Sequence, residues 1–425
     1  MTRSVARLAA LVFTAVCLSS CVRLTIAWAP LAPRGAEARP DVLAEFAADA
    51  PVASVADWEE RRAPLLRGAF ERDVYGAAPR LVGVRKSAVR PLDGSVYGDG
   101  VVAEEWTVEF TVETAAGERE EARFFADIIL PPGPGPHPAI LKQSFSSRAS
   151  ALPDMDVSAP DGGPRPEGAG EIPGIFLFVF GRYIMEPPVE MIVGRGYALI
   201  LLYPSEVAPD AREPGLAALS RLSGRDDDQL DRWGAVGAWA FVHSRMVDLL
   251  DADPRFDDDA TIAYGHSRYG KSALVAAAYD ERIDGVLSHQ SGTGGASLNR
   301  KKPGESVKSI TKSYPHWFSP AYGAFGGRTK EMEIDQHQLL ALIAPRPILL
   351  GNARRDVWSD PNGAFRAAQG ANPAYALYGS RGMTAERLDE FRPADDIAFW
   401  IRPGTHGVTE EDWPVFLEFL DAHFR

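Results

Sequence analysis

The stretch from residue 260 to residue 278, ATIAYGHSRYGKSALVAAA, constrains the fold of this chain more than any other. Its first five residues are apolar or β-branched and follow the acidic residues 257–259, which is typical of a short buried strand entered from a polar turn. From Lys271 onward the residues are small and apolar without glycine or proline, which predicts a helix. Between strand and helix lies GHSRYG. A serine in so tight a turn projects its hydroxyl from the edge of a sheet, at a helix N-terminus that stabilises developing negative charge.

The turn departs from the usual Gly-x-Ser-x-Gly pattern, because Tyr269 takes the second glycine position and Gly270 comes one residue later. Glycine is needed where a side chain would clash in so sharp a turn. A Gly-x-Ser alone fits an ordinary polar turn, but its combination with Arg268, Gly270 and Lys271 is far more specific. The segment GHSRYGK resembles the G-C/H-S-R-x-G-K turn of glucuronoyl esterases, which form carbohydrate esterase family 15 of the α/β-hydrolases.

Hydrophobic patterning agrees with such a fold. Strands alternate with helices across residues 138–424, which indicates a mostly parallel sheet, and period-two runs within residues 80–130 predict antiparallel strands. We therefore expect an α/β-hydrolase fold with a mostly parallel central sheet, helices on both faces and an N-terminal antiparallel β extension. The resemblance covers roughly residues 55–425 and is densest at GHSRYGK, SGTGG, DQHQLLALIAPRP with NARRDVW, and GTHG. The expected central strands are 138–142, 197–203, 260–264, 285–288, 347–351 and 397–401, with helices at 58–75 (interrupted by Pro64), 233–250 and 409–424.

Composition restricts the possible functions further. The 425 residues are 45% hydrophobic and 24% charged, as in ordinary globular proteins, and we expect residues 51–425 to form a single domain. A net charge of −13 without runs of lysine and arginine argues against a nucleic-acid surface. No HExxH motif or cluster of aspartate and histidine ligands is visible in the sequence, so we expect no metal and no cofactor. We also expect the chain to be a monomer.

The N-terminus is typical of an exported protein. Residues 1–21 begin with a basic end, continue with a short apolar run and close with LSSC, which resembles the lipobox of bacterial lipoproteins. This resemblance implies cleavage before Cys21 and lipidation of its thiol, with the protein anchored in the bacterial outer membrane by that lipid alone, or periplasmic. An ordinary cleaved signal or an uncleaved anchor is the alternative. Residues 22–50 are rich in alanine and proline and are interpreted as a tether. Because Cys17 and Cys21 are the only cysteines, the folded body contains no disulfide.

A serine nucleophile needs a base, and the base needs a carboxylate that orients it and stabilises its cation. In this fold the acid and then the histidine follow the serine along the chain. Of eight histidines, His406 comes directly after the last expected strand, in PGTHG, where glycines let the loop bend back toward Ser267. Asp356 follows the strand at 347–351, with Asp360 as a rival. We expect Ser267, His406 and Asp356 to form a catalytic triad.

Position 290 bears on the choice of the acid. Many glucuronoyl esterases carry a glutamate in an E-S-G-x-G-G segment after the preceding strand, whereas this chain has QSGTGG, beginning at Gln290. A glutamine can orient an imidazole by hydrogen bonding but cannot offset its charge. We therefore expect Asp356 to carry the role of the acid and substitution of Gln290 to have little effect.

The same resemblance assigns the rest of the pocket. The backbone N–H of Arg268 is expected to face the developing oxyanion, and in the family the side chain of this arginine also donates there. The loop at residues 143–145 is where this fold usually supplies its second oxyanion N–H. The resemblance implies that Lys271, one helical turn past the serine, binds sugar hydroxyls. It also implies that Trp358 lies beside the uronate ring and that Glu305 makes a further sugar contact.

The implied reaction is hydrolysis of the ester that joins glucuronate side groups of xylan to lignin alcohols. A carboxylesterase acting on other acyl or sugar esters is an alternative, and Lys271 and Trp358 distinguish it. A catalytically silent hydrolase-fold protein that binds polysaccharide is a third interpretation, favoured by Gln290. Residues 146–174, rich in proline, glycine, aspartate and serine, form either a rim loop over the pocket or a mobile insertion.

Overall fold

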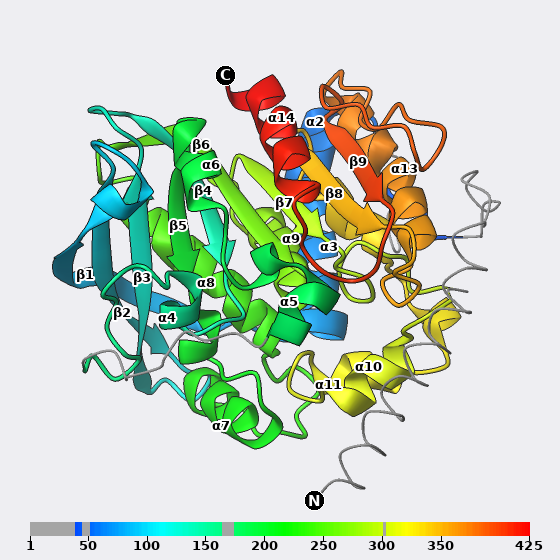
Figure 1. Cartoon of the computed structure of the whole chain (residues 1–425). Helices are drawn as coiled ribbons and strands as arrows, with labels where there is room; N and C mark the ends of the chain where they lie inside the picture. The colour runs from blue at the N-terminus through cyan, green and yellow to red at the C-terminus, as the bar shows by residue number, and fades with distance from the viewer. Residues whose placement is uncertain (1–38, 45–51, 164–173, 301–302) are drawn as a thin grey trace, which may run out of the picture.

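A computed structural model describes residues 39–44, 52–163, 174–300 and 303–425 (Figure 1). The expected signal segment, with Cys21, lies outside these residues. No helix within the described ranges is long and apolar enough to cross a membrane.

Residues 39–44, near the end of the expected tether, contact the rest of the fold. The Pro40 carbonyl oxygen lies 2.8 Å from His337 Nε2, and the Val42 side chain is buried. The Val42 carbonyl accepts a hydrogen bond from Arg62 Nε at 3.1 Å. This short segment therefore packs against the domain that follows it.

A single sheet crosses the described part of the chain, with nine strands in the order β1-β2-β3-β5-β4-β6-β7-β8-β9. From β5 onward neighbouring strands pair in parallel, whereas β1, β2 and β3 form an antiparallel extension and β3 also pairs antiparallel with β5. Figure 1 shows this extension at one side of the molecule and β9 toward the other. The α/β-hydrolase fold expected from the sequence is confirmed. The strands are β1 (Arg80–Leu92), β2 (Val102–Glu113), β3 (Arg119–Leu130), β4 (His137–Gln143), β5 (Ala198–Leu202), β6 (Phe256–His266), β7 (Gly285–His289), β8 (Ile348–Ala353) and β9 (Ile397–Arg402).

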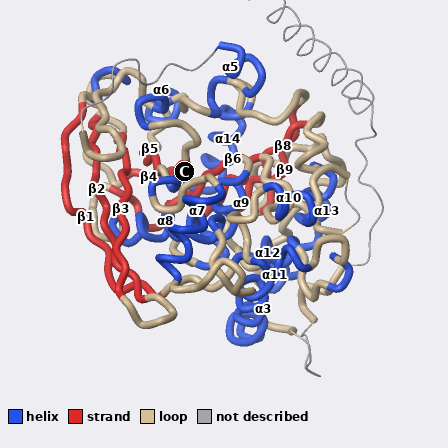
Figure 2. The backbone as a smooth tube through the Cα atoms, turned by 90° about the horizontal axis from the view of Figure 1, so that it is seen from below, coloured by secondary structure: helices blue, strands red, loops and turns tan. Residues whose placement is uncertain are grey.

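Helices cover both faces of the central strands, as expected. In β6, Ala263 joins the apolar cluster that contains Trp239 of α8. Its neighbours Ile262 and Tyr264 point to the opposite face and join a second cluster, with Trp413 of α14. Figure 2 shows α6 and α14 on one side of the central strands and α8, α9 and α12 on the other. The helices are α2 (Val55–Asp57), α3 (Ala63–Phe70), α4 (Arg148–Ala151), α5 (Gly174–Phe180), α6 (Val189–Gly194), α7 (Arg212–Ser223), α8 (Ala235–Leu250), α9 (Arg268–Tyr279), α10 (Val307–Ser313), α11 (Pro320–Ala324), α12 (Gln336–Ala341), α13 (Pro361–Leu377) and α14 (Asp412–Phe424).

Two elements differ from the sequence expectation. β6 begins at Phe256, so the acidic residues 257–259 belong to the strand and not to a turn; their side chains are mostly exposed, which an extended backbone permits. Pro64 does not interrupt the first helix. A π-helical turn (Trp58–Arg62) leads directly into α3, and Pro64 lies at the start of α3, where the helix changes type and does not break. The other expected central strands agree with the structure to within two residues at each end.

A buried ion cluster holds the first part of the segment expected to be a rim loop or a mobile insertion. Arg148 in α4 contacts Asp127 of β3 and lies 2.5 Å from Glu105 of β2, and the three side chains are 1%, 0% and 5% exposed. Further along the same segment, the Ser158 N–H donates to Glu105 at 2.8 Å. The chain between Arg148 and Ser158 is therefore tied to the antiparallel extension.

We expect Arg148→Met to lower the free energy of unfolding by about 3–5 kcal/mol, because it leaves the buried carboxylates of Asp127 and Glu105 without this partner. Urea-induced unfolding measures the effect. Arg182→Met is the matched control, since Arg182 is 63% exposed in its pair with Glu186, and exposed pairs contribute at most about 1 kcal/mol. Similar losses in the two variants would contradict the assignment of a structural role to the buried cluster.

Candidate active site

Ser267 occupies a strained turn between β6 and α9. Its φ of 55° and ψ of −122° lie outside the regions that residues with side chains ordinarily adopt. The turn has no room for a side chain at position 265, because a Cβ added to Gly265 would lie 1.9 Å from the Tyr269 carbonyl oxygen. Tyr269 itself is accommodated because its buried ring packs against Phe145 and Trp239. The sharp strand-to-helix turn expected at GHSRYG is therefore present.

His406 and Asp356 meet after the carboxyl ends of two neighbouring strands. Asp356 follows β8 and His406 follows β9, and the imidazole Nδ1 lies 2.7 Å from the carboxylate Oδ2. Burial acts to raise the pKa of Asp356, but the hydrogen bond and charge of His406 bring it below its ordinary value, so the carboxylate stays ionised. The rival Asp360 caps α13 instead, accepting the Gly363 N–H at 3.0 Å. Asp356 is thus the aspartate that contacts His406.

The loop of His406 lies over the turn that carries Ser267. The ring centroid of His266, which immediately precedes Ser267, is 4.6 Å from that of His406. Among the described side chains His406 contacts Asp356 and, at 3.4 Å, Ser359, and no hydrogen bond joins it to Ser267. In unliganded enzymes the hydrogen bond between nucleophile and base is often long and shortens when substrate binds.

Two further imidazoles form a buried layer beneath His406. The rings of His266 and His289 have centroids 5.0 Å apart, and their Nδ1 atoms are separated by 3.4 Å. Burial lowers the pKa of His289 to about 4, although Asp412 at 3.6 Å acts in the opposite direction. Burial, together with the charges of His406 and His289, holds the pKa of His266 well below its ordinary value. Both imidazoles are therefore neutral at neutral pH.

Gln290 contacts the main chain on both sides of His406 and not the imidazole. Its Nε2 donates to the Thr405 carbonyl at 3.2 Å, and its Oε1 accepts the Gly407 N–H at 2.9 Å. The residue follows β7 directly, has a φ of 51° and is buried. No pattern in the sequence indicates this pair of contacts.

Arg268 is held by residues that the sequence analysis did not single out. Its Nε lies 2.7 Å from Asp210 Oδ2, and its guanidinium carbon lies 4.4 Å from the ring centroid of Phe145, in the loop expected to supply an oxyanion N–H. Asp210 Oδ1 lies 3.1 Å from His316 Nε2 and accepts a hydrogen bond from Trp317 Nε1 at 2.7 Å. Burial acts to raise the pKa of Asp210, but these contacts and the Arg268 charge lower it, so an ionised carboxylate fixes the arginine.

The three residues expected to contact the sugar lie around the SGTGG segment. Lys271 Nζ donates to the carbonyls of Ser291 and, at 2.8 Å, of Thr293. Thr293 Oγ1 donates to the Glu305 carbonyl at 2.7 Å, and the Glu305 N–H donates to the Trp358 carbonyl at 3.3 Å. Lys271 and Glu305 are buried, whereas Trp358 is 58% exposed. The structure thus brings these residues into one region with an exposed aromatic ring.

Comparison with known proteins identifies the family. A family model described as glucuronyl esterase, fungi, matches residues 184–379. A solved CE15 esterase from a marine bacterial metagenome, described as promiscuous, matches with a TM-score of 0.77 and 28% identity, covering 92% of this chain and 98% of that one. The carbohydrate esterase MZ0003, from an unknown prokaryotic organism, is 31% identical over 384 residues, which are 88% of this chain and 86% of the relative. The chain belongs to carbohydrate esterase family 15.

This family 15 esterase is also similar to a glucuronoyl esterase from Solibacter usitatus, with a TM-score of 0.76 and 30% identity over 92% of this chain and 99% of that one. The 4-O-methyl-glucuronoyl methylesterase of Hypocrea jecorina is 32% identical over 155 residues, which are 34% of each chain. Family membership makes the chain a carboxylic ester hydrolase and confirms the resemblance inferred from GHSRYGK.

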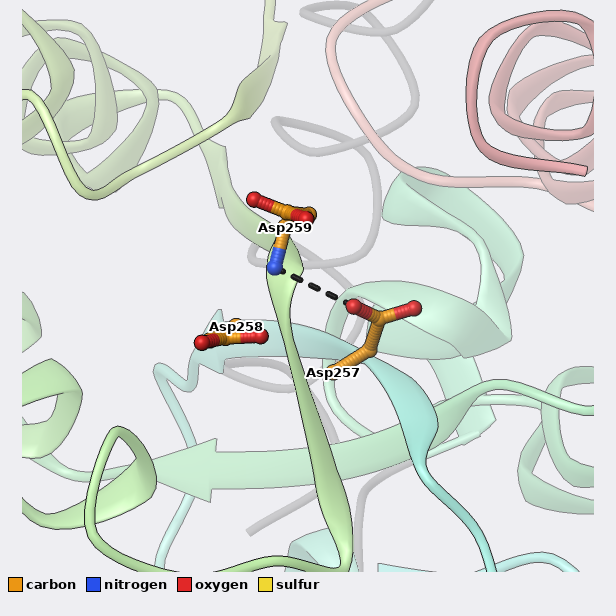
Figure 3. Close-up of side chains that lie close together, drawn as sticks. All are labelled: Asp257, Asp258 and Asp259. Atoms are coloured by element: carbon orange, nitrogen blue, oxygen red, sulfur yellow. Dashed lines mark hydrogen bonds between the residues drawn. The ribbon is translucent and has the colours of Figure 1, made fainter.

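The esterase carries one carboxylate cluster away from this site. Within the described ranges, Asp257, Asp258 and Asp259 are the group of three ligand-type side chains whose oxygens lie within 4.8 Å of one another. They lie at the start of β6, at the opposite end of that strand from Ser267. Figure 3 shows them with the Asp259 N–H donating to Asp257 Oδ1 at 3.1 Å. Two of the three are exposed, and exposed acidic groups commonly occur without a metal, so we assign none here.

We expect Asp356→Asn to lower the kcat of this esterase by about 10³- to 10⁴-fold, because an amide cannot stabilise the imidazolium of His406 and permits the wrong tautomer. Asp360→Asn is the matched control. It should keep the activity within about threefold of the unmodified chain, since asparagine caps a helix as well as aspartate does. Steady-state hydrolysis of p-nitrophenyl acetate compares the two variants. A larger loss for Asp360→Asn would mean that the wrong aspartate has been chosen.

Proposed function

We propose that this family 15 esterase hydrolyses esters of glucuronate, such as those joining 4-O-methyl-glucuronate side groups of xylan to lignin alcohols. The observation that carries the proposal is the 2.7 Å contact between His406 and Asp356 over the strained turn of Ser267. The names of two relatives support the acyl group, since one is a glucuronoyl esterase and the other a 4-O-methyl-glucuronoyl methylesterase.

In the proposed mechanism Ser267 Oγ attacks the ester carbonyl while His406 Nε2 accepts its proton. Asp356 stabilises the imidazolium that forms. The intermediate collapses when His406 gives this proton to the leaving alcohol, and the glucuronoyl group remains esterified to Ser267. Water, deprotonated by His406, then attacks this acyl-enzyme. The products are the uronate carboxylate, a proton and the free serine.

Arg268 is proposed to stabilise the negative oxygen of both tetrahedral intermediates through its backbone N–H and its guanidinium, with a second N–H from residues 143–145. The ion pair with Asp210 and the Phe145 ring hold the guanidinium before substrate arrives. Donors fixed in advance need little reorganisation in the transition state, which is the main source of their effect.

Lys271, Glu305 and Trp358 are proposed to bind the uronate ring. The exposed face of Trp358 offers a surface on which a sugar ring can stack. The ammonium of Lys271 is oriented by two carbonyls of the SGTGG segment. This group of residues would select a glucuronate over a simple acyl group.

A broader ester specificity is the second candidate function. The marine relative is described as a promiscuous CE15 esterase and matches over 92% of this chain. The proposed mechanism of Ser267, His406 and Asp356 would be the same, and only the contribution of the uronate contacts would be smaller.

We expect protein lacking residues 1–21 to hydrolyse benzyl glucuronate with a higher kcat/KM than p-nitrophenyl acetate. Ser267→Ala should lower both activities by about 10⁴-fold or more and leave the far-UV circular dichroism unchanged, because the hydroxyl is the nucleophile. Trp358→Ala should raise the KM for the glucuronate ester alone.

Each outcome separates the candidates. Turnover retained by Ser267→Ala would refute the mechanism. Cleavage of the acetate alone by the unmodified protein would favour the broader carboxylesterase, and cleavage of neither ester would favour a silent polysaccharide-binding protein.

We further propose that residues 51–425 are exported as a single catalytic domain, on which residues 39–44 pack, and that the part of residues 22–50 before this packed segment tethers the domain to a lipid on Cys21. The LSSC sequence at the end of an apolar run supports this arrangement. Metabolic labelling with palmitate in a bacterial host should label the full chain and not its Cys21→Ala variant. Equal labelling of the two chains would exclude Cys21 as the modified residue.

A further inference from the structure

We propose that Gln290 is a positioning residue that fixes His406 through the main chain, and that this role requires a carboxamide. The proposal rests on the function proposed above, because it takes His406 as the base. Gln290 Nε2 donates to the carbonyl before His406, at Thr405, and Gln290 Oε1 accepts the N–H after it, at Gly407. One side chain therefore bonds both neighbours of the histidine and leaves the imidazole to Asp356.

The His406 loop needs such external contacts because glycines flank it. Gly404 and Gly407 have φ values of 105° and 154°, and glycine restricts its own backbone less than any other residue. Arg402 supplies contacts from the other direction, donating from Nη2 to the carbonyls of Thr405 at 3.2 Å and Gly407 at 2.7 Å. The Arg402 guanidinium has only donors and cannot bind the Gly407 N–H. Among the contacts of the described residues, that N–H is bound by Gln290.

Gln290 is itself well anchored, as a positioning residue must be. Its N–H donates to the Gly351 carbonyl of β8 at 2.8 Å, and its carbonyl accepts a hydrogen bond from Ser359 Oγ at 3.1 Å. The Ser359 N–H donates in turn to Asp356 Oδ1 at 3.2 Å. The residue thus connects the loop that carries the acid with the loop that carries the base.

The two contacts predict that a carboxylate at this position would keep only one of them. A glutamate at this position would still accept the Gly407 N–H. Its second oxygen would face the Thr405 carbonyl, however, and two acceptors repel each other unless the carboxyl is protonated. This geometry revises the sequence expectation that substitution of Gln290 has little effect.

The first test is Gln290→Leu, which preserves most of the side-chain volume and removes both hydrogen bonds. We expect kcat to fall about 10- to 100-fold, and by the same factor for benzyl glucuronate and p-nitrophenyl acetate, because displacement of a catalytic group by about 1 Å costs roughly 10²-fold. KM for both esters should change less than twofold. Unchanged kcat for both esters would overturn the proposal, as would a loss confined to the glucuronate ester, which indicates a binding role.

Gln338→Leu is the matched control. Gln338 is likewise buried and binds main chain on two sides, donating to the Asp41 carbonyl at 3.3 Å and accepting the Asp335 N–H at 2.9 Å. It lies in α12, outside the site, so its substitution should lower stability without lowering kcat. An equal fall in kcat for Gln338→Leu would mean that Gln290→Leu acts through general destabilisation. That result would overturn the proposal.

Gln290→Glu is the second variant, for use if Gln290→Leu does not fold. It tests whether the side chain must donate a hydrogen bond to the Thr405 carbonyl. We expect reduced activity whose ratio to that of the unmodified protein rises as the pH falls, since a protonated carboxyl can donate to the Thr405 carbonyl.

One readout is independent of the proposed substrate. The Nδ1–H proton of His406, bonded to Asp356 at 2.7 Å, should give a downfield proton resonance that Gln290→Leu weakens or shifts and Gln338→Leu does not. If the unmodified protein cleaves neither ester, the proposed function fails and this resonance still decides the proposal. An unaltered resonance in Gln290→Leu would overturn it.

Discussion

The strained turn that carries Ser267, with no room for a side chain at Gly265, is the constraint around which the site is arranged. A φ of 55° at Ser267 is retained because β6 is paired on both sides and α9 packs beneath the turn, so the surrounding contacts outweigh the local strain. The carboxyl ends of parallel strands share one edge of a sheet, so the loops after β8 and β9 emerge beside this turn. Asp356 and His406 meet there although 49 residues separate them in the sequence.

Below that edge of the sheet, some of the buried titratable side chains are neutral and others form an ion pair. His266 and His289 are held neutral by burial, whereas Arg402 and Asp412 form a buried ion pair at 2.9 Å. Removing one member of such a pair leaves an uncompensated buried charge, which is strongly unfavourable. Because Arg402 bonds the loop of His406 and Asp412 begins α14, this pair connects the histidine loop to the last helix.

The sequence predicted the features that local patterns determine. The strand-turn-helix unit around Ser267, the central strands and the family are confirmed, and the expected contact between His406 and Asp356 is present, while their catalytic roles stay predictions. What the sequence did not indicate depends on the approach of distant segments. Asp210 contacts Arg268 from 58 positions away, and Gln290 binds main-chain atoms, which have no sequence signature. The start of β6 was misplaced because an acidic run favours a turn unless a strand pairing overrides it.

The exposure of Trp358 makes its fluorescence sensitive to quenchers in the solvent. Indole emission is quenched by a soluble ion such as iodide only where solvent reaches the ring, and Trp358 is 58% exposed. The tryptophans that are buried, by contrast, are Trp58, Trp106, Trp233, Trp239, Trp317 and Trp413. Iodide therefore acts on Trp358 far more than on these, and a sugar ring lying on its face would shield it. With the sugar stacked on Trp358 as proposed, the loss of iodide quenching would report occupancy of the site without an attached label.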